Sequence, residues 1–170
     1  GPKDFTALCR EICTEMLLMT NFAKNKTEAK QMITRVLQDG SAMEKLRQMI
    51  IYQGGNPEVI NNYQLFAQAK HIIKVKSKES GYIKKIRTHS IGDAAMILGA
   101  GRKTKDDIID PSVGIKVIVK VGQLVEKGDT LAELYANGKE EARALEITEQ
   151  AFEITDEIVH KNKIVLDIIK

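Results

Sequence analysis

The sequence has no tryptophan, few aromatic residues of any kind, two cysteines and three prolines. It therefore lacks the side chain best suited to stack on bases, and no basic stripe carries interleaved aromatic residues. The net charge of +3 is small and dispersed over 170 residues. No apolar run approaches the roughly 20 residues that a membrane-spanning helix needs, and the N-terminus has no secretory signal pattern. We therefore expect no nucleic-acid partner, no membrane partner and a cytoplasmic location.

The two cysteines, Cys9 and Cys13, lie four residues apart on a predicted helix. That spacing suits two ligands of a metal ion, but no histidine or further cysteine lies close by in the sequence to complete a tetrahedral site. Both fall on the apolar stripe of the helix, and free cysteine is commonly a buried core residue. We therefore interpret both as packing residues, and we expect neither a metal site nor a disulfide.

The N-terminal third of the chain predicts three amphipathic helices, because apolar residues recur at helical spacing. These helices are expected over residues 5–19, 27–39 and 41–52. Asp4 is placed to cap the first helix, and Thr27 to open the second. Ser41 and Glu44 have the spacing of a capping box at the start of the third. Such helices fit a small bundle, or the last helices of a larger α/β lobe.

From about residue 69 the apolar period changes to that of strands. Strands are expected at 72–75, 82–86, 113–119, 130–135, 152–156 and 164–169, with helices at 90–98 and 138–151. Strands interspersed with segregated helices predict an α+β fold class. We expect two domains, residues 1–68 and residues 69–170.

The most distinctive stretch of the chain is residues 81–115, GYIKKIRTHSIGDAAMILGAGRKTKDDIIDPSVGI, which continues into VKVGQLVEKGDTLAELYAN at 119–137. It closely resembles the C-terminal domain of pyrimidine nucleoside phosphorylases, the family that includes thymidine phosphorylase. The resemblance extends backwards through residues 53–56 and 40–45 to residues 1–4. It therefore covers essentially the whole chain.

This resemblance implies a pentosyltransferase reaction, the phosphorolysis of a pyrimidine nucleoside to the free base and a pentose 1-phosphate. Phosphate would be a co-substrate, and no cofactor is expected. Residues 1–68 would be the helical end of the α/β lobe, and residues 69–170 the C-terminal α+β domain. The resemblance also implies an enzyme of nucleoside salvage that is a homodimer when intact. The sequence does not distinguish uridine from thymidine as the preferred substrate.

In that family the glycine-rich phosphate loop and the base-binding residues lie upstream of the segment that Gly1 matches. We therefore expect no catalytic and no phosphate-binding residue within this chain. By itself the chain is expected to be inactive.

Gly99-Ala100-Gly101-Arg102-Lys103 looks at first like an anion-binding loop. A phosphate loop follows a strand directly, whereas these glycines follow an apolar helix, where Gly99 is a candidate C-cap. Residues 99–111 are then a solvated connector, or a loop that approaches the active site when the enzyme closes. For the second alternative, Arg102 is the candidate contact with the opposing domain, with Gly99 and Gly101 beside it. Arginine suits that role because its planar guanidinium clamps an acid or a phosphate with two hydrogen bonds.

The histidines and the acids of this region do not predict a site. His89 stands beside Ser90 at the start of a predicted helix, where capping fits as well as catalysis. Asp106, Asp107 and Asp110 lack the spacing of an EF-hand, and we interpret them as part of a solvated loop.

Residues 121–131 carry two tight turns around Leu124 and Val125, a pattern that resembles the hammerhead strands of biotinyl and lipoyl carrier domains. A carrier domain needs a lysine in a Met-Lys-Met or Asp-Lys-Ala context, and neither tripeptide occurs in the sequence. A carrier-like domain, a non-catalytic interaction domain and the same domain of an AMP phosphorylase remain as alternatives. The GAGRKTKDDIID stretch favours the pyrimidine type.

Overall fold

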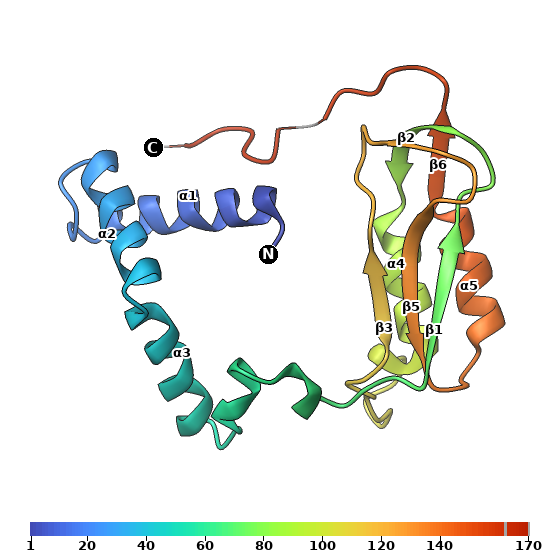
Figure 1. Cartoon of the computed structure of the whole chain (residues 1–170), viewed down its shortest axis with the longest axis horizontal. Coiled ribbons are helices and arrows are strands. Elements are labelled where there is room, and N and C mark those ends of the chain that lie inside the picture. The colour runs from blue at the N-terminus through green and yellow to red at the C-terminus, as the bar shows by residue number, and fades with distance from the viewer. Residues whose placement is uncertain (162, 170) are drawn as a thin grey trace. The chain divides into compact units, whose positions relative to one another are not determined.

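Figure 1 shows the computed structural model of the chain, which describes residues 1–161 and 163–169. The described residues divide into two compact units. One holds Gly1–Tyr63 together with the segment from Lys163 onward, and the other spans residues 64–161.

The first unit is built from the three predicted helices, which the structure confirms. They are α1 (Lys3–Met19), α2 (Lys26–Gln38) and α3 (Ser41–Tyr52), followed by a 3-10 turn at Pro57–Ile60. A second 3-10 turn, Tyr63–Leu65, lies where the two units join along the chain. Helix α2 packs against both α1 and α3. The buried residues of the α1–α2 pair are small or β-branched, which lets the two helices approach closely: Thr14, Ala23, Ala29 and Ile33.

The expected caps of these helices are wrong. Ser41 lies inside α3, because Gly40 takes the capping position in the left-handed region at φ 81°. The Ser41 N–H donates to the Asp39 carboxylate at 2.9 Å, so a neighbouring acid replaces the capping box. Helix α2 begins at Lys26, capped by the Asn25 side chain, and Asp4 lies within α1.

The apolar stripes that predicted the helices are largely exposed in this unit. Phe5 is 61% exposed, and Met16, Leu37 and Met49 are similar. Cys9 is half-buried and Cys13 is exposed, so the expectation of two buried cysteines is wrong. The reason is that α1 and α2 meet along small residues, which leaves the larger apolar side chains facing outward. None of the described helices is both long and apolar enough to cross a membrane.

The second unit contains two three-stranded antiparallel sheets. One has the order β1-β5-β3, made by His71–Lys76, Thr130–Ala136 and Gly114–Val117. The other has the order β4-β2-β6, made by Leu124–Val125, Gly81–Ile86 and Phe152–Thr155. Consecutive strands alternate between the two sheets from β1 to β6, so each sheet is assembled from segments that are not adjacent in the sequence.

Helices α4 (Thr88–Ala95) and α5 (Glu141–Gln150) pack against each other and against these strands (Figure 1). The core lies between them, with Val75, Ile83 and Leu134 fully buried from three strands. Burial of alternate strand residues against helices confirms the α+β fold class.

Two expectations fail in or after this unit. Residues 164–169 form no strand, because a strand needs a ladder partner and no described strand pairs with them. His89 does not cap α4, which begins at Thr88. The His89 side chain is 95% exposed, and its Nε2 lies 3.6 Å from the Asp93 carboxylate one turn along the helix.

Leu134→Ala should lower the free energy of unfolding of the second unit by about 3 kcal/mol, because the substitution leaves a cavity in the core. Leu124→Ala removes the same atoms from a side chain that is 59% exposed, and it should cost no more than about 0.5 kcal/mol. Urea denaturation of the whole chain, followed by hydrogen exchange of the β1 amides, measures both. Equal losses for the two variants would contradict the core described here.

Candidate functional site

The loop from Gly99 to Asp110 is closed at its neck by a hydrogen bond. The Asp110 N–H donates to the Gly99 carbonyl at 3.0 Å. Helix α4 runs into a π-helical turn at Met96–Ala100, and within that turn Gly99 has φ 113°, a conformation that L side chains rarely adopt. Gly99 is buried, so the interpretation of the whole segment as solvated is wrong at this end.

Gly101 packs closely against the turn before it. A Cβ at Gly101 would lie 3.3 Å from the Met96 Cβ, which is tighter than side chains normally approach. The two glycines of the predicted site are therefore accounted for by backbone geometry. Arg102 comes directly after them, is exposed, and makes no hydrogen bond or ion pair with any residue that the structure describes.

Asp107 holds the tip of the loop in shape. Its carboxylate accepts the N–H groups of Lys103 at 2.8 Å and Thr104 at 3.1 Å, and the Thr104 hydroxyl at 3.0 Å. The backbone N–H of Thr104, followed by that of Lys103, holds the pKa of Asp107 below its ordinary value of 3.8. Asp107 is thus a structural acceptor.

Asp110 anchors the other end of the loop. It accepts the Ser112 hydroxyl at 2.6 Å, the Ser112 N–H at 2.9 Å and the Asn137 amide Nδ2 at 2.7 Å. The Ser112 hydroxyl is the largest cause of a lowered pKa at Asp110. The sequence did not single out Asn137, whose only signal was an Asn-Gly pair that predicts a turn.

The charged side chains of the loop differ in how far they reach the solvent. Asp107 and Asp110 accept hydrogen bonds within the unit, whereas Arg102, Lys103 and Lys105 are exposed. Of the three acids that were interpreted as solvated, Asp106 is the one left exposed. The exposed charged side chains of the loop are therefore three basic residues and one acid, Asp106, and the basic ones can meet an anionic group or an acidic surface.

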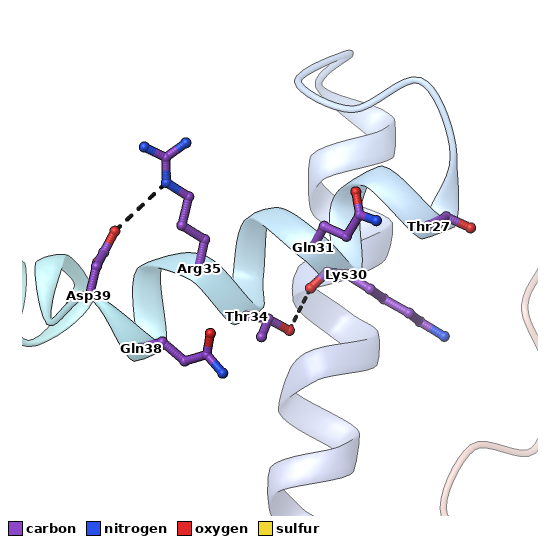
Figure 2. A pocket seen from close by; sticks show the side chains of 7 residues that line it. All are labelled: Thr27, Lys30, Gln31, Thr34, Arg35, Gln38 and Asp39. Atoms are coloured by element: carbon purple, nitrogen blue, oxygen red, sulfur yellow. Dashed lines mark hydrogen bonds and ion pairs between the residues drawn. The ribbon is translucent and has the colours of Figure 1, made fainter.

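The helical unit has a surface hollow along α2, and its side chains are those of one helix (Figure 2). The Arg35 Nε lies 3.9 Å from the Asp39 carboxylate, and the Thr34 hydroxyl donates to the Lys30 carbonyl at 2.8 Å. Both interactions join residues four positions apart on one helix, so they give no indication of a site. Among the described residues, no three His, Cys, Asp or Glu side chains gather as they would to hold a metal ion.

Residues 82–155, which include the loop and its anchor, match the family described as Pyrimidine nucleoside phosphorylase C-terminal domain. Over these residues the chain is similar to the C-terminal domain of pyrimidine nucleoside phosphorylases. The hammerhead-like residues 121–131, which suggested a carrier domain, lie inside the matched stretch.

Two curated relatives of the chain are pyrimidine-nucleoside phosphorylases. The one from Geobacillus stearothermophilus is 39% identical over 137 residues, which is 81% of this chain and 32% of the relative. The one from Staphylococcus aureus (strain USA300) is 35% identical over 159 residues, which is 94% of this chain and 37% of the relative. The chain spans about a third of the length of these relatives. The resemblance inferred from the sequence is confirmed.

The Asp107 carboxylate should titrate below its ordinary pKa of 3.8, because the Thr104 and Lys103 N–H groups stabilise its charged form. A lowered folded-state pKa means that the carboxylate stabilises the loop fully above the unfolded pKa. That stabilisation is lost as the pH falls through the lowered value. The amide chemical shifts of Lys103 and Thr104, followed by NMR between neutral pH and strongly acidic pH, report this midpoint.

Asp107→Asn is the control for this titration, since it removes the ionisable group with little change in size. It should abolish the step at both amides. A midpoint at or above 3.8 in the unsubstituted chain would show that the loop does not hold these hydrogen bonds in solution.

Proposed function

We propose that this chain is part of a pyrimidine nucleoside phosphorylase, which transfers a pentose from a pyrimidine base to phosphate. The observation that carries the proposal is the family match over residues 82–155, together with 35–39% identity to two curated pyrimidine-nucleoside phosphorylases. We also propose that the intact enzyme is a homodimer and that it acts in the cytoplasm in nucleoside salvage. Phosphate serves as a co-substrate in this reaction.

Phosphorolysis has two requirements, and a domain distant from the reacting atoms can serve the second. Phosphate must be held behind the anomeric carbon while an oxocarbenium-like transition state is stabilised. Water must also be kept out, because it competes with phosphate for the sugar. No catalytic or phosphate-binding role is assigned to a residue of this chain. In this proposal its second unit contributes to closure, and the chain by itself is inactive.

Within that unit, the Gly99–Asp110 loop is the proposed closure element, and Arg102 is its proposed contact. Three features support this assignment: the loop is held at both ends by hydrogen bonds, three of its four exposed charged side chains are basic, and the Arg102 side chain is exposed. A guanidinium offers two parallel hydrogen bonds to a carboxylate or a phosphate, and such charged bonds are stronger than neutral ones. Gly99 and Gly101 position Arg102 at the start of the loop.

A chimeric enzyme tests the proposed function. Residues 64–170 of this chain replace the corresponding C-terminal residues of the Geobacillus stearothermophilus relative, and release of free base from uridine or thymidine with phosphate is measured. Phosphorolysis within about tenfold of the relative is expected, which corresponds to about 1.4 kcal/mol in the activation barrier, because in this proposal the reacting groups all come from the relative. A folded, dimeric chimera that releases no base would contradict the proposal.

In the same chimera, Arg102→Ala should lower kcat/KM by about tenfold or more, since a hydrogen bond to a charged group contributes about 1.5–3 kcal/mol. The thermal stability should not change, because Arg102 is exposed and unpaired among the described residues. Lys105→Ala is the matched control, as it removes one positive charge from the same loop. Equal kinetics for both variants and the parent would leave the loop as a connector only.

A further inference from the structure

Three segments that are far apart in the sequence meet at the side chain of Asn137. Its Nδ2 donates to the Asp110 carboxylate at 2.7 Å and to the Ser112 hydroxyl at 2.9 Å. Its Oδ1 accepts the backbone N–H of Lys70 at 2.8 Å. Lys70 is the residue before β1, Asp110 ends the loop, and Asn137 follows β5.

The position of Asn137 follows from the register of the sheet. On one side His71 pairs with Ala136, so Lys70 and Asn137 continue the β1–β5 ladder by one residue. On the other side Gly114 pairs with Tyr135, so Ser112 and Asn137 continue the β3–β5 ladder by two. The strands stop there, and the side-chain amide of Asn137 makes the contacts that backbone groups would make in a longer sheet.

A primary amide is required for this set of contacts. Asn137 uses an acceptor toward Lys70 and donors toward Asp110 and Ser112. An aspartate is nearly the same size but offers acceptors only, and at this place it would face the Asp110 carboxylate. Alanine would remove all three contacts.

We propose that Asn137 is the positioning residue of the Gly99–Asp110 loop, which it fixes to the end of β5 and to the chain entering β1. The end of the loop therefore moves together with residue 70 and the sheet. Asn137 acts through Asp110, so it is not a catalytic residue. A role of Asn137 in enzyme closure rests on the proposed function. Its role in fixing the conformation of the loop does not.

The experiment uses the whole chain without substrate and measures trypsin cleavage after Arg102, Lys103 and Lys105 under native conditions. Asn137→Asp should accelerate cleavage in the loop by about tenfold or more, because it removes both donors and places two carboxylates together. Asn61→Asp makes the same chemical change at an exposed residue of the other unit. It should leave the cleavage rate of the loop unchanged.

The decisive variant exchanges the two partners, Asn137→Asp with Asp110→Asn. The pair is then complementary again, because the amide now at position 110 donates to the carboxylate now at position 137, which still accepts from Lys70. Cleavage in the exchanged variant should return to within about twofold of the original chain, since the two substitutions are strongly coupled. Rates are read relative to cleavage after Lys76 and Lys84, which lie in strands and report unfolding of the whole unit.

Two results would overturn the proposal. One is loop cleavage that Asn137→Asp leaves unchanged relative to the strands. The other is an exchanged variant as susceptible as Asn137→Asp alone. Since no nucleoside or phosphate is present, these results are independent of whether the chimeric enzyme shows phosphorolysis.

Discussion

Strand β5 is the constraint on which the second unit depends. It pairs with β1 on one side and with β3 on the other, and Ala132, Leu134 and Ala136 are completely buried from one of its faces. A slip of one residue would turn Glu133 and Tyr135 into the core and bring the aliphatic residues out, so the register is strongly specified. The same register places Asn137 between Lys70 and Ser112. Packing at one end of the strand thereby determines the hydrogen bonds at the other.

The Gly99–Asp110 loop is held in place by hydrogen bonds rather than by burial of apolar side chains. Ile108 is almost fully exposed, so apolar packing contributes little at the tip. Asp107 and Asp110 instead accept backbone and side-chain donors, which lowers the pKa of both carboxyl groups and fixes the chain around them. A rigid scaffold that carries an exposed loop is a common way to present binding residues. The closure role proposed for this loop requires such a scaffold.

The sequence predicted features that depend on local periodicity and missed those that depend on distant partners. Helices α1 to α3 and strands β1, β2, β5 and β6 were predicted because their apolar residues recur at a regular period. The capping box predicted at Ser41 was wrong because Gly40, in the left-handed conformation, takes the N-cap position and leaves Ser41 inside the helix. Residues 164–169 have the composition of a strand, but a strand is defined by a partner. Asn137 went unnoticed because Lys70 and Asp110 are 67 and 27 residues away.

The most direct test of this account is the hydrogen exchange of every amide in the whole chain. If β5 organises the second unit, the amides of β5 and of its partner β1 should be the slowest to exchange in that unit. They should also exchange at a common rate, because both become exposed only when the whole unit unfolds. The amides of residues 101–109 should exchange faster through local opening, because their hydrogen bonds are exposed. Exchange of β5 ahead of the loop, or independently of β1, would contradict the claim that this strand organises the unit.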